Sequence, residues 1–342
     1  MVVSYAMYGG MKLITIFSAS FIAILIGILP LFPDIVAQQT TKNEQHNKVV
    51  IINFDDGHKS QYTDAKPILD KYGFKATFYV VCNYIGNKQG YMDWKEVETL
   101  HKEGHDIGSH SMSHVHLSKL SKKNIKYEVG QSKKCLQDHG IEATSFAYPF
   151  NDGSYDKNIL DMVSKYYEIA RTANDPVTYL RCDGLKEKSN QTQCRINTHS
   201  LKYANIPTTS GWSHDFSRMS YSFGDLELFE KFIQVVNAQD KYNVNGVINA
   251  VPIIIYHRVG TNATVDYNTD SELFDKEMKY LHDNNFTVLT MNDLAYDNKL
   301  GYIYIKEFEP PEESGIIANA DSYSQSDNKK PLTANQSNSS ID

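Results

Sequence analysis

The sequence predicts an α/β fold, a distorted (β/α) barrel with about seven parallel strands. Short apolar runs rich in β-branched residues alternate with segments of helical periodicity through the middle of the chain, a pattern typical of βαβ units. About seven such units follow one another, which favours a barrel over an open sheet. This middle part is about 250 residues long, the usual size of such a barrel.

The predicted strands are buried apolar runs bounded by polar residues or glycine. In chain order they are Val49–Phe54, Ala76–Val81, Asp106–Ser109, Ser145–Tyr148, Glu168–Arg171, Val251–Tyr256 and Phe286–Leu289. The predicted helices lie between them and carry apolar residues at helical spacing. They are Pro67–Tyr72, Trp94–Glu103, Ile125–Leu136, Ile159–Lys165, Leu226–Gln239 and Leu273–His282.

The two ends of the chain differ from its middle. Lys12 precedes the apolar run Leu13–Phe32, and Ala37 leads into a polar stretch, so residues 1–37 are interpreted as a signal peptide. The run is also long enough to span a bilayer, so an N-terminal membrane anchor is the alternative. Both interpretations predict an exported protein, extracellular or at the cell surface. Residues 38–48 are a predicted linker, 49–298 the folded domain, and 299–342 a disordered polar tail.

Charge and cysteine content restrict the function further. The net charge is -7, and no long Lys/Arg cluster is present, which argues against a nucleic-acid partner. Export permits disulfides. Of the four cysteines, Cys182 and Cys194 bracket a polar loop that they could close, and the alternative is that all four are free.

Four polar motifs come directly after predicted strands. They are Asp55-Asp56-Gly57, the segment His110–His114, Tyr148-Pro149-Phe150, and His257. The carboxyl ends of the strands in a βα barrel meet at one face, where the active site is built. The positions of these motifs therefore predict one common site.

His110 and His114 are candidates for a metal site. Residues four apart on a helical turn share one face, so the two imidazoles can hold one ion. Asp56 from another strand end would complete a two-histidine, one-carboxylate set that leaves room for water and substrate. The alternative for the histidines is a surface or capping role. His116 is predicted to be structural.

The paired aspartates need an unusual backbone to act together. Strict strand alternation would send Asp55 and Asp56 to opposite faces. Gly57 can break that pattern, so that both carboxylates reach the pocket. One could then bind metal while the other accepts a proton. The alternative is a solvated Asp-Gly turn.

These motifs resemble those of the polysaccharide deacetylase family, also called the NodB-homology domain or carbohydrate esterase family four. The resemblance covers Val49 to Asn298. Asn53-Phe54-Asp55-Asp56-Gly57 is similar to the family motif Thr-Phe-Asp-Asp-Gly, with Asn in place of Thr. His110–His114 is similar to His-Ser/Thr-x-x-His, and Ile255-Tyr256-His257 resembles the last motif. The first two motifs together are strongly specific.

The resemblance implies an enzyme that removes N-acetyl groups from acetylated poly- or oligosaccharides. It implies a divalent metal, with Zn²⁺ expected and Co²⁺, Mn²⁺ or Ni²⁺ also accepted by such ligands. The implied roles are Asp55 as general base, His257 as general acid, Asp56, His110 and His114 as metal ligands, and Tyr148 and Pro149 in oxyanion or substrate binding.

Two departures from the family pattern stand out. The third motif often begins with an Arg that orients the catalytic Asp, and here Ala147 holds that place. Arg171, after the next strand, is the predicted substitute, and a surface salt bridge is its alternative role. The fourth motif is not recognisable: Trp212 with Asp215 is a poor match, and Trp212 is interpreted as a core or loop-anchoring residue. The region Pro176–Phe223 is expected to set specificity.

Two other functions compete with this one. The first is a non-catalytic cell-surface carbohydrate-binding protein on the same barrel, which the missing Arg favours. The second is an O-acetyl polysaccharide esterase, because the same site can attack esters.

Overall fold

The computed structural model describes residues 48–180, 208–215, 224–244, 246–261, 266–297 and 302–308. The predicted signal or anchor and the linker up to residue 47 lie outside these ranges, as do Cys182, Cys194 and most of the predicted specificity region. Those interpretations stay predictions. Within the described ranges, no helix combines the length and apolar character needed to cross a membrane.

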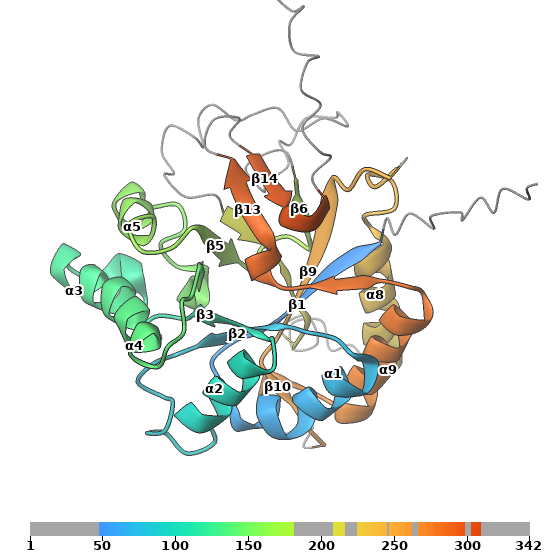
Figure 1. Cartoon of the computed structure of the whole chain (residues 1–342), viewed down its shortest axis with the longest axis horizontal. Helices are drawn as coiled ribbons and strands as arrows, with labels where there is room; N and C mark the ends of the chain where they lie inside the picture. The colour runs from blue at the N-terminus through green and yellow to red at the C-terminus, as the bar shows by residue number, and fades with distance from the viewer. Residues whose placement is uncertain are drawn as a thin grey trace, which may run out of the picture. The chain divides into compact units, whose positions relative to one another are not determined.

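Parallel strands form the centre of the fold (Figure 1). Hydrogen bonds order them β9-β1-β2-β3-β4-β5-β7, and each pairing in this series is parallel. The predicted strands are confirmed to within one residue of their expected bounds. The strands of the series are β1 (Val49–Phe54), β2 (Thr77–Val80), β3 (Asp106–Ser109), β4 (Ser145–Ala147), β5 (Ile169–Thr172), β7 (Thr208–Ser210) and β9 (Ala250–Tyr256).

One segment closes the ring of strands. Its first half, β7, pairs with β5, and its second half, β8 (Trp212–Ser213), pairs with β9, also in parallel. Gly211 joins the two halves, and a Cβ there would lie 3.0 Å from the carbonyl oxygen of Ile253, so this close approach requires glycine. The distorted barrel of about seven parallel strands is therefore confirmed, with β7 and β8 sharing one position.

β7 was not among the predicted strands and lies in the region that was expected only to set specificity. The sequence Thr-Thr-Ser lacks the apolar run that identified the other strands. Its hydroxyl groups find partners in neighbouring segments: Thr209 Oγ1 donates to Ala170 O at 3.1 Å, and Ser210 Oγ accepts from Asp175 N at 2.7 Å. A polar strand can be buried when its polar groups are hydrogen-bonded in this way.

Helices connect the strands and cover them on the outside. The helices are α1 (Lys66–Tyr72), α2 (Trp94–Lys102), α3 (Lys122–Lys126), α4 (Ser132–Asp138), α5 (Lys157–Val163), α8 (Asp225–Asn237) and α9 (Ser271–Asp283). Figure 1 shows α1, α8 and α9 on one side of the strands and α3, α4 and α5 on the other. Asp93 begins α2 with a capping box, because its side chain accepts from Glu96 N while Glu96 accepts from Asp93 N. The predicted helix Ile125–Leu136 is interrupted by a π-helical turn, Tyr127–Gln131.

Short strands lie outside the ring. β6 (Val177–Tyr179) runs antiparallel to β9, and β12 (Thr287–Leu289) pairs with the start of β1. The predicted strand Phe286–Leu289 is thus real but is not a member of the ring. β14 (Tyr302–Ile305) pairs with β13 (Leu294–Asp297), so the predicted tail boundary at residue 299 was wrong for residues 302–308. The alternating Tyr-Ile pattern buries Ile303 and Ile305, which explains the strand.

The core is divided by the alternation of side chains along each strand. In β1, Val50, Ile52 and Phe54 belong to the cluster packed against the helices. Val49 and Ile51 belong to a second cluster, whose members include Tyr79, Ala147, Ile253 and Ile255, and these fill the inside of the barrel. All six residues of β1 are buried, as expected for a strand covered on both faces.

Candidate active site

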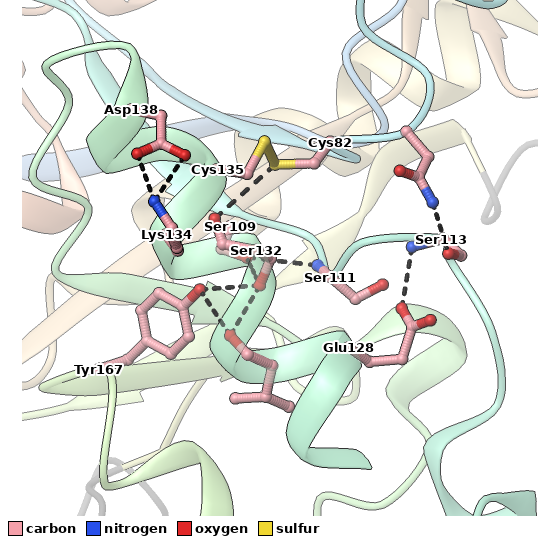
Figure 2. The surroundings of a disulfide bond; sticks show 12 residues. Cys82, Ser109, Ser111, Ser113, Glu128, Ser132, Lys134, Cys135, Asp138 and Tyr167 are labelled. Carbon is pink, nitrogen blue, oxygen red and sulfur yellow. Dashed lines mark hydrogen bonds and ion pairs between the residues drawn. A yellow bond between two sulfur atoms is a disulfide. The ribbon is translucent and has the colours of Figure 1, made fainter. Parts of the chain in front are cut away.

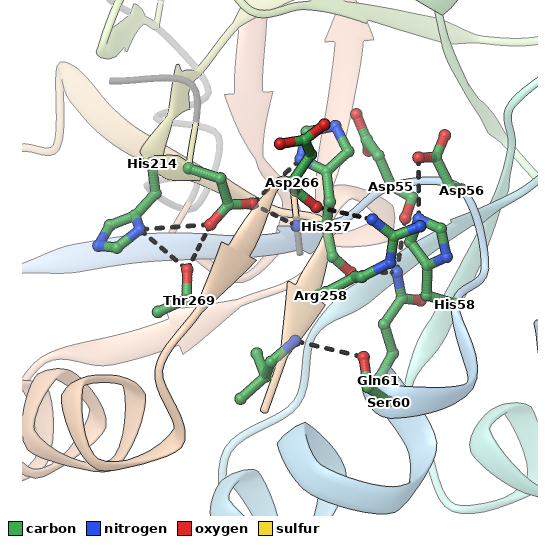
Figure 3. A network of polar contacts seen from close by, with 12 residues as sticks. Asp55, Asp56, His58, Ser60, Gln61, His214, His257, Arg258, Asp266 and Thr269 are labelled. Carbon is green, nitrogen blue, oxygen red and sulfur yellow. Dashed lines mark hydrogen bonds and ion pairs between the residues drawn. The ribbon is translucent and has the colours of Figure 1, made fainter. Parts of the chain in front are cut away.

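The ends of β1 and β9 lie together and bring two of the predicted catalytic residues close to each other. Asp55 follows β1 and His257 follows β9, and the N–H of Asp55 donates to the carbonyl of Tyr256 at 2.9 Å. The buried side chain of Gln61 donates from Nε2 to the carbonyl oxygens of both Asp55 (2.5 Å) and His257 (2.7 Å). Gln61 therefore fixes the two strand ends relative to each other (Figure 3).

The predicted metal ligands converge. Asp56 Oδ1 lies 3.6 Å from His110 Nε2 and 3.3 Å from His114 Nε2, and one ligand atom from each residue falls within 4.8 Å of the others. Asp56 Oδ1 is buried and has no hydrogen-bond partner among the described residues. A buried carboxylate oxygen between two imidazole nitrogens fits a divalent cation.

Left-handed backbone conformations build this cluster. Asp56 and Gly57 have φ angles of 76° and 82°, so the change of direction predicted for Gly57 begins one residue earlier. Ser111 and His114 also have positive φ angles, 69° and 53°. Such conformations are costly for residues other than glycine and concentrate at functional sites. The predicted helical turn for the histidines was wrong: the segment is a loop, and the Ser111 Oγ accepts from His114 N at 3.0 Å.

The histidine loop is held from below by α4 and the turn before it (Figure 2). Glu128 accepts from Ser113 N with its side chain at 2.9 Å and from Met112 N with its carbonyl at 3.2 Å. A disulfide joins Cys82, just after β2, to Cys135 in α4. Because Cys82 N donates to Ser111 O at 3.3 Å, the disulfide fixes a segment that contacts the loop directly. The sequence did not predict this pairing.

Hydrogen bonds and burial set the histidine ligands in the form that binds metal. His110 Nδ1 lies 2.9 Å from the carbonyl of Ala147, which can only accept, so Nδ1 carries the proton and the lone pair of Nε2 faces Asp56. Burial lowers the pKa of His114 to about 4. His114 is therefore neutral near pH 7, as a metal ligand must be.

His58 is a part of the site that the sequence analysis missed. Its ring is 3% exposed, packs against Tyr91 at 4.5 Å, and places Nε2 3.2 Å from Asp56 Oδ2. Asp56 thus turns one oxygen toward His110 and His114 and the other toward His58. The only sequence signal was the position of His58, directly after the Asp-Asp-Gly motif.

The predicted base Asp55 lies against Arg171. Arg171 Nη2 contacts Asp55 Oδ1, and the two residues are 2% and 5% exposed. Burial raises the pKa of Asp55, but the Arg171 guanidinium, helped by protonated His257, outweighs it and leaves the pKa below its usual value. The carboxylate is ionised at neutral pH, as a general base requires. The surface alternative for Arg171 is excluded by its burial.

Strand register explains how Arg171 reaches Asp55. Ala147 in β4 pairs directly with Arg171 in β5. Partners in a parallel pair point to the same face, here the inside of the barrel, where the guanidinium lies 4.8 Å from the centre of the Tyr79 ring. The Arg that the family motif places at position 147 is thus replaced by one on the neighbouring strand, in the same register.

His257 is held by Asp215. Asp215 Oδ2 accepts from the His257 backbone N at 2.7 Å and lies 3.1 Å from its Nδ1. Burial lowers the pKa of His257, but the Asp215 carboxylate, together with Asp56 and Asp55, raises it to about 9. From the sequence, Asp215 was only a poor match to the fourth motif and was given no role, because the strand before it, β8, was not predicted. Trp212 is 9% exposed and belongs to the core, as predicted.

The predicted oxyanion role is not available to the backbone of Tyr148. Its N–H already donates to Arg171 O at 3.1 Å, and Pro149 has no N–H. The Tyr148 side chain is 2% exposed and packs on Phe146. The next N–H belongs to Phe150, which has no acceptor among the described residues, a φ of 57°, and a ring 4.4 Å from that of His114.

Comparison with known proteins confirms the family resemblance. Residues 42–167 match the family model described as polysaccharide deacetylase. This segment includes the three metal-site residues and Asp55, and it ends before Arg171, Asp215 and His257.

Curated relatives match similar stretches. A chitin deacetylase from Arthroderma benhamiae is 40% identical over 86 residues, which are 24% of this chain and 22% of that protein. A peptidoglycan-N-acetylglucosamine deacetylase from Bacillus cereus is 30% identical over 105 residues, or 30% of this chain and 47% of that protein. The Bacillus subtilis protein YxkH, whose polysaccharide deacetylase name is provisional, is 32% identical over 127 residues, or 37% and 44%. The chain spans less than half the length of each of these relatives.

Among solved structures, the family 4 carbohydrate esterase from Streptomyces lividans in complex with acetate has a TM-score of 0.47 and 12% identity. The match covers 76% of this chain and 98% of that chain.

Proposed function

From the match of residues 42–167 to the polysaccharide deacetylase family model, we propose that this chain is a metal-dependent hydrolase that removes N-acetyl groups from N-acetylhexosamine units of poly- or oligosaccharides. One observation carries the proposal. Asp56, His110 and His114 form a cluster whose donor atoms fit a divalent cation, and the buried Asp55–Arg171 pair adjoins it. A protein that only bound glycans would need neither this cluster nor a buried carboxylate paired with an arginine.

The chain's own residues then carry the protons. A divalent cation held by the cluster would supply Lewis acidity at the acetyl carbonyl. Asp55, ionised beside Arg171, accepts a proton from the water whose oxygen attacks the carbonyl carbon. The Phe150 N–H is the backbone donor free to bind the developing oxyanion. His257 gives its proton to the sugar nitrogen as the carbon–nitrogen bond breaks, so that acetate and a free amine result.

Zn²⁺ is the proposed ion, because two imidazoles and one carboxylate with open positions are typical of catalytic zinc sites. The same set accepts Co²⁺, Mn²⁺ or Ni²⁺. Acetate release measured after loading the metal-free protein with each ion in turn would identify the best one.

The test of the function is acetate release from N-acetylglucosamine oligomers and from peptidoglycan. We expect release by the Zn-loaded protein, loss of release on chelation, and recovery when zinc is returned. Asp55→Asn should abolish release while leaving bound zinc unchanged, since it keeps the size of the base and removes its charge. Tight glycan binding with no acetate from any substrate would support the binding-protein alternative. Release from acetylated xylan alone would support the O-acetyl esterase.

The place of action is part of the proposal. The charged residue Lys12 and the apolar run Leu13–Phe32 support export, with the chain either released or anchored at the membrane. Extracellular and envelope glycans are the substrates that an exported deacetylase would meet.

A further inference from the structure

A line of buried polar side chains leads away from His257 into the protein. Beyond Asp215 it comprises Thr269 of β11 (Asn268–Thr269), His214 directly after β8, and Glu277 of α9. Thr269, His214 and Glu277 are each 0% exposed, and Asp215 is 1% exposed. None of these residues reaches the metal cluster.

Each contact in the line fixes the next. Asp215 uses Oδ2 for His257 and turns Oδ1 to the Thr269 hydroxyl, which donates to it. Thr269 Oγ1 also lies 3.1 Å from His214 Nδ1. His214 Nε2 lies 2.7 Å from Glu277 Oε1. Figure 3 shows the part of the network from His214 and Thr269 to His257. Glu277 Oε2 accepts from Tyr256 OH at 2.8 Å, so both of its oxygens are held.

The donors and acceptors of this network require His214 to be positively charged. The single Thr269 hydroxyl hydrogen points at Asp215, whose carboxylate can only accept, so Thr269 must accept from His214 Nδ1. The Glu277 carboxylate in turn accepts from His214 Nε2. Both ring nitrogens therefore carry hydrogen, and His214 is an imidazolium between two carboxylates. In agreement, burial lowers the pKa of His214, but Glu277 and Asp215 raise it to about 9.

Stability is a poor explanation for this arrangement. Burying several charged groups costs desolvation energy that their mutual attraction repays only with good geometry, and apolar residues of similar volume often stabilise a protein more. The network does have a clear geometric effect on the site. It holds Asp215 with Oδ2 toward His257 Nδ1, which leaves Nε2 as the ring nitrogen able to carry a proton to the substrate.

We propose that Glu277 and His214 are positioning residues for the acid His257, acting through Thr269 and Asp215. The proposal rests on the proposed function, since it assumes that His257 donates a proton during turnover. It adds two residues, far from the metal cluster, to the set on which the reaction depends.

Two variants that remove charges of opposite sign from the network test this proposal. Glu277→Gln leaves His214 paired with Asp215 alone, which weakens the pull of Asp215 on the His257 proton and lowers the pKa of His257. His214→Gln removes a cation that competes for Asp215, and so raises the pKa of His257. The double variant restores the charge balance. Other titratable groups near His257 are unchanged in all three: Asp55, Asp56, His58 and His114.

For Glu277→Gln we expect kcat to fall about 10-fold, a typical effect of losing a supporting hydrogen bond. KM and bound zinc should be unchanged, and the alkaline limb of the kcat–pH profile should move to lower pH. His214→Gln should move the limb to higher pH, and the double variant should lie between the two. Limbs that stay in place, or that move in the same direction, would overturn the proposal. Where a single variant fails to fold by circular dichroism, the double variant and Thr269→Val supply the comparison.

A second measurement separates this proposal from the proposed function. The pKa of His257 can be followed by NMR in the ¹⁵N-histidine-labelled, Zn-loaded protein, with His257→Gln to assign the signal. We expect the same opposite shifts without any substrate. If the shifts occur and no glycan is deacetylated, the network stands and the proposed reaction fails. If acetate is released and the shifts are absent, the positioning role fails alone.

Discussion

Arg171 lies against Asp55 inside the barrel, with its guanidinium Nη2 in contact with Asp55 Oδ1 and both residues almost fully buried. The pair is possible because Ala147, the partner of Arg171 across the β4–β5 ladder, is small and leaves the space beside Asp55 to Arg171. Removing one partner of a buried ion pair leaves an unpaired charge and costs about 3–5 kcal/mol. The relationship therefore bears on both stability and catalysis.

Arg171→Ala is expected to reduce kcat about 100-fold or more, because Asp55 loses the group that orients it and keeps it ionised. Bound zinc should change little, since Arg171 contacts none of the three ligands. Acetate release and zinc content are measured for the wild type and the variant, in samples that contain the same fraction of folded protein.

The double variant Arg171→Ala with Ala147→Arg is the matched test. It returns the guanidinium from the neighbouring strand, where the family motif has its Arg, and should recover part of the lost activity. Arg171→Lys should recover less, because lysine cannot reproduce the planar donor geometry. Full activity of Arg171→Ala would show that Asp55 does not need this partner.

The sequence was sufficient to predict the ring strands that are apolar runs, and the site residues that follow them. The apolar, β-branched composition of Val49–Phe54 predicted a strand. Asp55, Asp56 and His257 were predicted as site residues because the sites of such barrels form at strand ends. Arg171 was proposed because it follows the next predicted strand. These inferences depend on local signals of only a few residues.

The parts that were missed depend on contacts between distant segments. The strand β8 follows the polar strand β7, whose hydroxyls find their partners in neighbouring segments of the barrel, so neither strand was predicted and Asp215 was given no role. The pairing of Cys82 with Cys135 spans 53 residues and cannot be read from spacing. Tyr148 was expected in oxyanion or substrate binding, and only the strand register shows that its N–H donates to Arg171 O.

His58 is predicted to support metal binding by holding the second oxygen of Asp56. His58→Leu should weaken zinc affinity by about 10–100-fold, the usual cost of losing such a partner to a ligand. Titration calorimetry on the chelator-treated protein measures this without substrate. His116→Ala is the control, because His116 stacks on Phe150 and does not contact Asp56. Equal affinities for the two variants would contradict the prediction.

The disulfide is predicted to stabilise the fold and the histidine loop together. A cross-link closing a loop of this length typically contributes about 2–4 kcal/mol. The double variant Cys82→Ser with Cys135→Ser should therefore unfold at lower denaturant concentration. It should also bind zinc less tightly, since Cys82 N supports Ser111 O next to the ligands. A stability loss with unchanged zinc affinity would mean that the other contacts of the loop, with Glu128 and Asn83, hold it without the disulfide.

Asp215→Asn tests the origin of the acid's pKa. His257 must be protonated to donate, so activity is present below its pKa and is lost as the pH rises through it. The Asp215 carboxylate helps raise this pKa to about 9, and its removal should lower the value by about 1–3 units. The alkaline limb of the kcat–pH profile should move to lower pH by the same amount, while KM stays constant because Asn still accepts from His257 N. Wild type and variant must carry the same amount of zinc, since a nearby cation itself lowers the pKa of His257. A limb that stays in place in the folded, zinc-loaded variant would mean that a group other than His257 supplies the proton to the leaving amine.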